Sequence, residues 1–159
     1  MKRLACAVLI LCLIPVCALA DDPLYKTSVF FDVLAETLGV PTLPETFEET
    51  TKENGNTERI YTLSDGIKVL YELDKNKIVC LSVVCMSADD YIDFLGVCCA
   101  GVYSVCETIS PVVCGNVLLQ FMQLRSGNDV NIEIYNDYVY KVSAIGGGRM
   151  AFIFTNGGN

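Results

Sequence analysis

Cysteine is the residue type with the most chemistry to offer in this chain. The sequence of 159 residues holds nine cysteines and no histidine. Without histidine, a Ser-His-Asp triad, a Cys-His pair and a histidine-ligated zinc site are all excluded. The cysteines form no Cys-x-x-Cys redox motif and have no zinc-like spacing. We therefore predict neither a metal site nor a cofactor, and we assign no catalytic residue.

Three of the cysteines lie in the first 20 residues, which have the pattern of a secretory signal peptide. A basic start, Met1-Lys2-Arg3, is followed by an apolar run that closes on Ala18-Leu19-Ala20. This order predicts export to the periplasm or the extracellular space, with cleavage after Ala20. The apolar run is short for a membrane span and contains Pro15, so an uncleaved anchor is the less favoured alternative.

The six cysteines after Ala20 are open to two interpretations. An even number in an exported chain is typical of a disulfide framework, and Cys106 and Cys114, on either side of a predicted turn between helices, are best placed to bond. The cysteines nevertheless sit in apolar, core-like runs, and the signal peptide also uses cysteine as a small hydrophobic residue. Both interpretations stay open for these two residues. A bond between the neighbours Cys98 and Cys99 is disfavoured because it would distort the helix.

Two further clusters carry groups that could do chemistry. Asp89, Asp90 and Asp93 could hold calcium or act as an acid–base pair, but their spacing fits no known calcium loop. We interpret them as acidic residues at the start of a helix, where they meet the positive end of the helix dipole. Gly146-Gly147-Gly148-Arg149 could cradle an anion, but it lacks the strand-to-helix context of phosphate loops. We interpret this segment as a hairpin turn.

The charge balance restricts the class of partner. Eleven basic and 19 acidic residues give a net charge of −8. Cleavage after Ala20 would remove Lys2 and Arg3 but no acidic residue, and would therefore take the net charge from −8 to −10. A nucleic-acid-binding protein needs a basic face to replace the counterions on phosphate, so nucleic acid is excluded as a partner. The length of residues 21–159 predicts a single domain.

The apolar stretch 94–124 raises the question of a membrane hairpin. It contains one charged residue, Glu107. Each half is about 15 residues long, short of the ~20 that a membrane span needs. Both halves also keep a polar side, which in the second half consists of Asn116, Gln120 and Gln123. We therefore predict helices that pack on a sheet, and no membrane span after cleavage of the signal peptide.

The elements that position these residues follow two periodicities. Apolar residues recur at helical spacing in 28–38, in 88–107 and from Ser110-Pro111 to Gly127. A spacing of two predicts six strands, which are 58–64, 67–73, 78–86, 130–135, 139–145 and 149–155. Residues 41–57 are polar and acidic and are predicted to form a solvated connection, with at most a weak helix after Pro44.

Together these elements predict an α+β fold, in which helices pack on one face of an antiparallel sheet of about six strands. Their order is also compatible with two repeats of an (α)αβββ unit, residues 22–86 and 88–155. The Asp65-Gly66 turn is typical of a two-residue hairpin. The expected pairing places Arg59 opposite Glu72 and Tyr61 opposite Leu70. A three-residue connection, Asn136-Asp137-Tyr138, is expected between the fourth and fifth strands.

The sheet face opposite the helices is the candidate functional surface. Helices can cover one face of an antiparallel sheet and leave the other exposed. With the expected pairing, this face mixes aromatic, aliphatic and charged side chains, which are Tyr61, Leu63, Leu70, Tyr135, Ile153, Arg59 and Lys141. Such a mixture is typical of surfaces that recognise proteins. We therefore predict a non-catalytic binding protein whose partner is another protein.

Two alternatives belong to other functional classes. One is a carboxylate-dependent enzyme that acts on a glycan, which would require two facing carboxylates in a pocket. The other is a structural envelope component that self-associates as a homo-oligomer and buries the same sheet face against a second copy. A partner sheet or the N-terminal segment could also cover this face.

Overall fold

The computed structural model describes residues 24–157 except 65, 76, 88–89 and 109. The predicted signal peptide, residues 1–20, lies outside the described residues. The helices and strands follow one another as α2 (Tyr25–Leu38), β1 (Glu48–Thr51), β2 (Thr57–Ser64), β3 (Ile67–Asp74), β4 (Lys77–Cys85), α3 (Tyr91–Cys106), α4 (Pro111–Arg125), β5 (Glu133–Tyr135), β6 (Tyr138–Gly146) and β7 (Arg149–Asn156).

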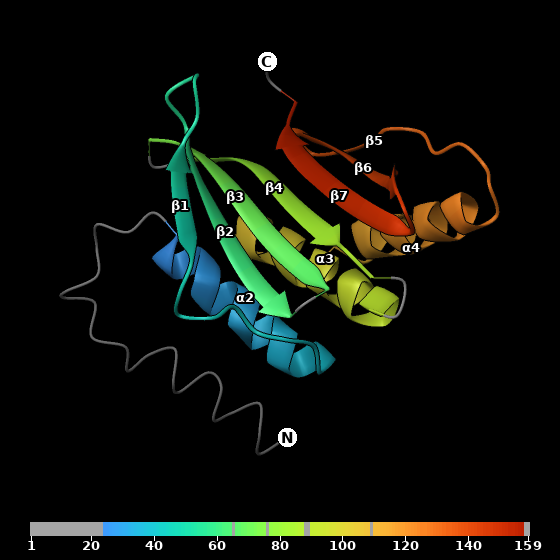
Figure 1. The fold of residues 1–159 in the computed structure, drawn as a ribbon, viewed down its shortest axis with the longest axis horizontal. Coiled ribbons are helices and arrows are strands. Elements are labelled where there is room, and N and C mark those ends of the chain that lie inside the picture. The colour runs from blue at the N-terminus through green and yellow to red at the C-terminus, as the bar shows by residue number, and fades with distance from the viewer. Residues whose placement is uncertain (1–23, 65, 76, 88–89, 109, 158–159) are drawn as a thin grey trace.

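The seven strands form one antiparallel sheet in the order β1-β2-β3-β4-β7-β6-β5. Helices α2, α3 and α4 lie on the same side of this sheet (Figure 1). The predicted α+β fold with helices on one face of an antiparallel sheet is therefore confirmed. The division of the chain into two repeats stays a prediction.

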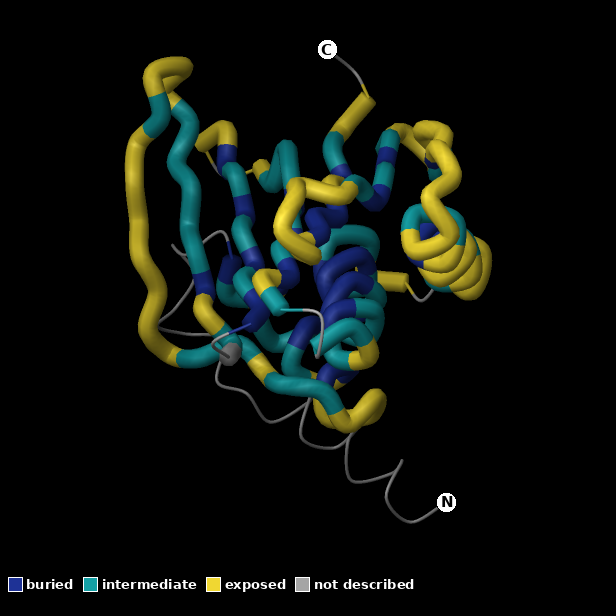
Figure 2. The backbone as a smooth tube through the Cα atoms, turned by 45° about the vertical axis from the view of Figure 1, so that its right-hand side comes forward, coloured by how far each residue is buried: buried dark blue, intermediate teal, exposed yellow. Residues whose placement is uncertain are grey.

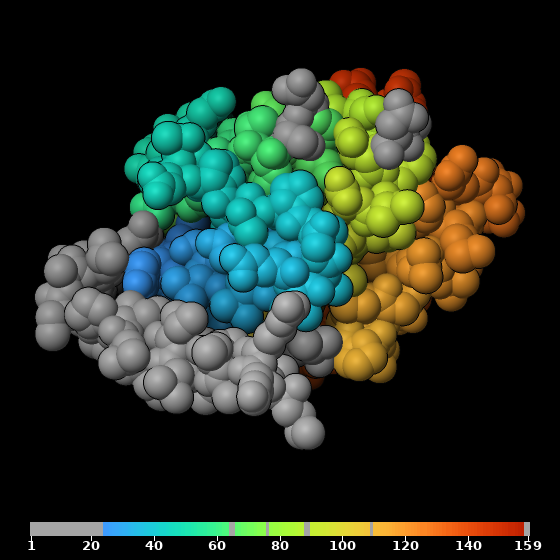
Figure 3. All heavy atoms as spheres, turned by 90° about the horizontal axis from the view of Figure 1, so that it is seen from below, coloured from blue at the N-terminus to red at the C-terminus, as the bar shows by residue number. Residues whose placement is uncertain are grey.

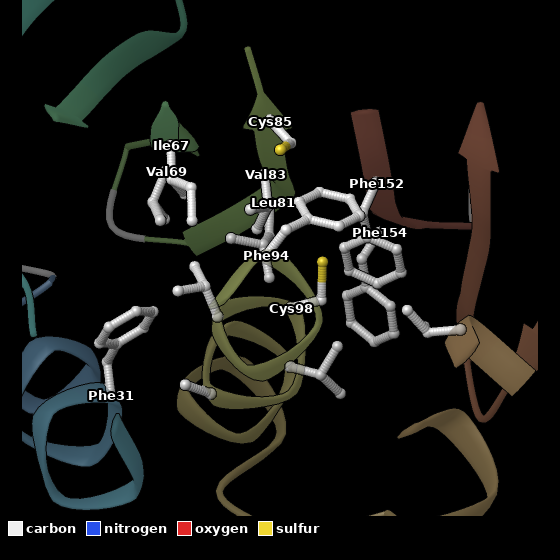
Figure 4. Close-up of a cluster of buried hydrophobic side chains, with 14 of the residues drawn as sticks. Phe31, Ile67, Val69, Leu81, Val83, Cys85, Phe94, Cys98, Phe152 and Phe154 are labelled. Atoms are coloured by element: carbon white, nitrogen blue, oxygen red, sulfur yellow. The ribbon is translucent and has the colours of Figure 1, made fainter. Parts of the chain in front are cut away.

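The centre of the core lies between β4 and α3. Strand β4 is the middle strand of the sheet, and Leu81 and Val83 on its helix side are fully buried. Phe94 and Cys98 of α3 point toward them, and Phe152 of β7 lies alongside (Figure 4). The apolar run of β4 fits this central position, because a central strand, with a neighbouring strand on each side, favours apolar residues throughout.

A glycine of α3 sets how closely this helix approaches the sheet. A Cβ atom added at Gly101 would lie 2.8 Å from Cδ2 of Leu81. No real side chain tolerates such a contact without movement, so glycine allows α3 to rest directly on β4. At the other end of α3, a Cβ atom at Gly96 would lie 2.5 Å from Cγ1 of Val40. The connection that follows α2 thus packs against the start of α3 (Figure 3).

Strand β1 lies in the segment 41–57, which was predicted to be a solvated connection. All four of its residues are exposed, so the alternation of apolar and polar residues that identifies a half-buried strand is absent. The strand is held at the sheet edge by backbone pairing with β2. An ion pair between Arg59 Nε and Glu49 Oε2, 2.7 Å apart, supports the same contact. Charged side chains also protect such an edge from pairing with other chains.

The β2–β3 hairpin has a different register from the one expected. Arg59 pairs with Tyr71 and Tyr61 with Val69, one residue away from the predicted partners, and a bulge lies between Thr62 and Ser64. A shift of one residue moves every side chain of a strand to the opposite face. Tyr61 consequently points into the core, where it is 5% exposed.

The β5–β6 hairpin differs from the prediction for the same physical reason. Its turn has two residues, Asn136 and Asp137, because Tyr135 pairs with Tyr138. Asn136 adopts the left-handed backbone conformation, with φ of 53°, that tight turns require. With one residue fewer in the turn, Tyr135 packs against the core and Ile134 is turned outward, 73% exposed.

Helix α4 begins as predicted but turns its polar side toward the sheet. Ser110 caps it by accepting a hydrogen bond from the Val113 N–H, and a proline follows at the first helical position. The buried Gln120 accepts a hydrogen bond from the Val142 N–H (2.7 Å) and donates one to the Asn131 carbonyl (3.1 Å). Strand β5 starts too late to pair with Val142, so the Gln120 carboxamide takes the place of the missing β5–β6 hydrogen bond.

Replacing Gln120 is therefore expected to destabilise the fold. In Gln120→Met, a side chain of similar size leaves the buried Val142 N–H and Asn131 carbonyl without a partner. We expect the free energy of unfolding, measured by urea denaturation, to fall by about 1–3 kcal/mol. The matched control is Gln123→Met, one turn away and half-buried, with an expected change within about 0.5 kcal/mol. Equal losses in the two variants would contradict this role of Gln120.

Candidate functional site on the open face of the sheet

The outer face of the sheet is the face opposite the helices. One row of paired residues crosses five of its strands, and its members are Ile60, Leu70, Ser82, Ile153 and Lys141. Within the described part of the chain, no helix or strand lies over this row (Figure 1). Leu70 is half-buried by its neighbours, and Ile153 is 42% exposed. Three members of the row are aliphatic, Ser82 lies between Leu70 and Ile153, and the row ends in a lysine.

A depression of about 980 Å³ lies next to this row. The turn between β1 and β2 and the adjoining ends of β3 and β4 line one side, and β6 and β7 line the other. Its lining residues include Asn54, Asn56, Glu72, Asp74, Lys77, Cys80, Val139, Ile153, Thr155 and Asn156. The volume falls in the range of about 300–1,000 Å³ that is typical of ligand sites.

The polar side of the depression is organised around Glu72. Its carboxylate accepts hydrogen bonds from Lys52 Nζ at 2.6 Å, Asn56 Nδ2 at 2.7 Å and Asn54 Nδ2 at 3.3 Å. Lys52 also pairs with Glu58, 2.8 Å away. The hydrogen bonds from Lys52 and Asn56 lower the pKa of Glu72, and those from Lys52 to Glu58 and Glu72 raise the pKa of Lys52. Glu72 is therefore a fixed anion and is unsuited to donate a proton in catalysis.

Cys80 is the nucleophilic group of the depression. It is half-buried, and its sulfur lies 3.7 Å from the Ser82 hydroxyl. Burial raises the pKa of the Cys80 thiol. A thiol that stays protonated at neutral pH is a poor nucleophile. The depression is consequently better suited to binding than to covalent chemistry.

The structure brings some of the predicted site residues together and separates others. Leu70, Lys141 and Ile153 lie in one row of the outer face, as predicted. The predicted outward positions of Tyr61 and Tyr135 are wrong, because the hairpin registers turn both toward the core.

Two other predicted site residues also lie away from the outer face. Leu63, beside the β2 bulge, packs against the core rather than facing solvent. Arg59 lies on the helix side of β2, opposite Tyr71. Its guanidinium group lies over the Phe47 ring, with 4.7 Å between the Arg59 Cζ and the ring centroid. These contacts make Arg59 part of the sheet edge near α2.

Helix α4 carries an exposed apolar surface that the sequence patterns did not indicate as a site. We name it the α4 stripe, and its residues are Val112 (65% exposed), Leu118 (46%), Leu119 (53%) and Met122 (57%). Much of α4 is exposed along its outer side (Figure 2). The polar side of α4 faces the sheet through Asn116 and Gln120, so part of its apolar surface is left exposed.

Two other carboxylates of the described residues line a second depression. Asp32 and Glu45 line a small depression of about 220 Å³, below the size of typical ligand sites. Burial raises the pKa of Asp32, and the Asp32 carboxylate accepts a hydrogen bond from the Leu43 N–H at 2.9 Å. Asp32 thus ties the connection after α2 to that helix.

The acidic cluster and the glycine-rich segment that the sequence singled out belong to a helix start and a turn. Asp93 lies in the first turn of α3, as predicted, whereas Asp89 lies outside the described residues. The glycines 146–148 form the β6–β7 turn, and Arg149 Nε donates a hydrogen bond to the Gly146 carbonyl at 3.1 Å. Among the described residues, no three Cys, Asp or Glu side chains are grouped so that they could hold a metal ion.

All six cysteines of the described residues are free thiols. The pairing considered from the sequence joined Cys106 to Cys114. In the structure, both of these residues are half-buried and neither forms a disulfide.

Comparison with known proteins finds no matching family model, no matching curated protein and no matching solved structure. In the described ranges, no helix is both long enough and apolar enough to span a membrane.

The contacts of Glu72 predict a pH dependence of stability. Because its folded-state pKa lies below the ordinary value of 4.5, ionised Glu72 stabilises the fold above that pH. This contribution is lost as the pH falls through the lowered folded-state pKa. We expect Glu72→Gln to reduce the free energy of unfolding at pH 7 by no more than about 1 kcal/mol, since the group is partly exposed.

The measurement is urea denaturation from pH 7 down to pH 3. The difference between the wild type and Glu72→Gln should shrink as the pH falls. Glu53→Gln is the control, because Glu53 is an exposed carboxylate in the same turn between β1 and β2. A difference that persists unchanged at pH 3 would contradict the assigned cause.

Proposed function

We propose that the protein is an exported, non-catalytic binding protein that recognises another protein through the outer face of its sheet. The observation that carries this proposal is a row of paired residues that crosses five strands with no described element above it, and its members are Ile60, Leu70, Ser82, Ile153 and Lys141. Export is supported by the signal-peptide pattern of residues 1–20.

The composition of the outer face suits protein recognition. Aliphatic side chains at its centre, such as Leu70 and Ile153, gain free energy when a partner removes them from water. Lysine side chains at the margin, such as Lys141, favour a defined orientation of the partner more than they add affinity. The strands hold these groups in fixed positions, so little conformational entropy is lost when a partner binds.

The polar network beside the row restricts what a partner can offer. Lys52 already pairs with both Glu58 and Glu72, and the three groups together keep one net negative charge. A partner that buried this network without replacing its water would lose hydrogen bonds. We therefore expect the partner to contact the aliphatic row directly and to leave the network at the hydrated margin of the interface.

The proposal predicts that binding is lost when the row is altered. The outer-face variant carries Leu70→Thr, Lys141→Glu and Ile153→Thr, because threonine keeps the β-propensity of these positions. Wild type and variant are produced from the full-length sequence with a C-terminal affinity tag, and the folding of each is checked by circular dichroism. We expect the wild type to retain a partner from the native extracellular or envelope fraction and the variant to retain at least tenfold less.

The matched control is the helix-face variant, which carries Leu118→Ser and Met122→Ser on the α4 stripe. It should retain the same partner as the wild type. Loss of the partner from the helix-face variant alone, or equal retention by all three proteins, would overturn the assignment of the outer face. Failure of the folded wild type to retain any protein would overturn protein binding itself.

A second candidate function, self-association, is favoured by the α4 stripe. The stripe exposes four large aliphatic side chains and no charged group. Two copies of a chain with a net charge of −8 repel each other, so an uncharged surface is the natural place for them to meet. Gly115, which is exposed on the same helix, would allow the backbones to approach closely.

Self-association is tested by sedimentation equilibrium between low and high micromolar concentrations. We expect the mass of the wild type to rise toward that of a dimer and the helix-face variant to remain a monomer. The outer-face variant serves as the control and should follow the wild type. A wild type that stays monomeric at every concentration would contradict this second function and leave the first intact.

A further inference from the structure

The two outermost strands of the sheet differ in what they expose to solvent. At one edge, β1 exposes Glu48 and Glu49 beside two threonines. At the other edge, β5 and the residue before it expose large aliphatic side chains, since Ile132 is 65% exposed and Ile134 is 73% exposed. Charge on an edge strand discourages pairing with another chain, whereas an apolar edge favours it. The β5 edge is therefore the one that suits an extension of the sheet.

The backbone of β5 has hydrogen-bonding groups that the sheet does not use. Tyr135 pairs with Tyr138 on either side of the two-residue turn, and Glu133 pairs with Tyr140. In a hairpin of this kind, the pair that flanks the turn and every second pair after it exchange hydrogen bonds. The N–H and C=O of Ile134, which lies between two such pairs, consequently point away from β6. Because the sheet ends at β5, these groups have no backbone partner within the described part of the chain.

The same alternation includes Ile132, directly before β5. The Asn131 carbonyl accepts a hydrogen bond from Gln120, and Gln120 in turn accepts one from the Val142 N–H of β6. Asn131 therefore points toward β6, and its neighbour Ile132 points away, as Ile134 does. Two sets of N–H and C=O groups are thus presented at this edge, about 6.8 Å apart along the chain.

Glu133 places a negative charge between the two isoleucines. It pairs with the buried Tyr140, so its side chain lies on the helix side of the sheet, where it is half-buried. In the described ranges, no basic side chain lies within ion-pair distance of its carboxylate. A basic residue directly opposite Glu133 on an added strand would share this face and supply the opposite charge.

We propose that the β5 edge binds an extended segment of another protein, which joins the seven-stranded sheet as an additional antiparallel strand. The backbone of this segment pairs with Ile132 and Ile134, and its apolar side chains lie against the two isoleucines. A lysine or arginine between them faces Glu133. Neither isoleucine belongs to the row on the outer face, so this inference goes beyond the proposed function and does not depend on it.

A second copy of this chain fits the edge less well than a basic segment does. The antiparallel pairing of two β5 edges that sets Ile132 opposite Ile134 also sets Glu133 directly opposite Glu133 of the other copy. Like charges in such a position destabilise the pairing. The net charge of −8 on each copy adds to the repulsion.

The test uses a synthetic peptide, acetyl-Lys-Thr-Val-Lys-Val-Thr-Lys-amide, in which two valines and the central lysine supply the expected pattern. The protein is produced from the full-length sequence, and binding is measured by the fluorescence anisotropy of the labelled peptide. The matched control peptide is N-methylated at both valines, which keeps every side chain but removes two backbone donors. We expect it to bind about tenfold more weakly. A folded wild type that binds neither peptide, or both equally, would overturn the proposal.

A substitution in β5 tests the same hydrogen bonds from the side of the protein. Ile134→Pro removes the outward N–H and leaves the β5–β6 hydrogen bonds in place, because proline is tolerated on edge strands. We expect binding of the peptide to weaken about tenfold, whereas Ile134→Val, which keeps the N–H, should bind as the wild type does. Leu70→Thr on the outer face should also leave binding unchanged. Equal binding by folded Ile134→Pro would contradict the proposal.

A charge exchange tests the position of the basic residue. Replacing the central lysine of the peptide by glutamate should weaken binding to the wild type about threefold, and Glu133→Lys should reverse this preference. Hydrogen exchange followed by NMR gives a direct readout, because the Ile134 amide should exchange more slowly when the peptide is bound. The amide of Thr51, on the opposite edge, should be unaffected. An unchanged peptide preference in Glu133→Lys, or unchanged exchange at Ile134 with peptide bound, would overturn the proposal.

Discussion

The close contact between α3 and β4 is the constraint on which the rest of the structure depends. Gly101 brings the helix onto Leu81 of the middle strand, and the side chains around this contact are fully buried. A sheet of seven strands covered on one side by three helices buries the helix side of its central strands and leaves the other side to solvent. The open outer face is thus a direct consequence of how the core is built.

The short length of β5 explains why α4 turns its polar side toward the sheet. Because β5 has only three residues, part of β6 has no strand partner on the edge that faces β5, and Gln120 supplies hydrogen bonds there. Asn116 likewise donates a hydrogen bond to the Tyr140 hydroxyl at 3.0 Å. Because the side-chain amides of Asn116 and Gln120 bond to the sheet, the aliphatic residues on the other side of α4 face solvent. Satisfying buried polar groups at one edge therefore creates an apolar surface elsewhere.

The sequence was sufficient to predict the fold class and most element positions, because strong local signals mark them. Ser110-Pro111 begins α4, Gly39 ends α2 in the left-handed conformation, and Met150, Phe152 and Phe154 alternate into the core. The exposed edge strand β1 lacks such a signal, since none of its residues is buried.

The candidate site was harder to predict, because successive residues of a strand point to opposite faces of the sheet. An error of one residue in the pairing therefore assigns a side chain to the wrong face. A bulge in β2 and a turn one residue shorter than expected before β6 reversed the faces of Tyr61 and Tyr135. Leu70, Lys141 and Ile153 kept their predicted face because no such irregularity separates them in the central pairings. The side of α4 that faces the sheet could not be predicted either. It depends on backbone groups of β6 that have no strand partner on the edge that faces β5.

Site-specific photo-crosslinking in cells that naturally produce the chain tests the central claim most directly. A photoreactive phenylalanine analogue is placed at position 153 on the outer face, at position 118 on the α4 stripe, or at position 37, which is exposed on α2. The account predicts a crosslink from position 153 to a different protein and none from position 37. Crosslinks to a different protein from position 118 but not from position 153 would contradict the account.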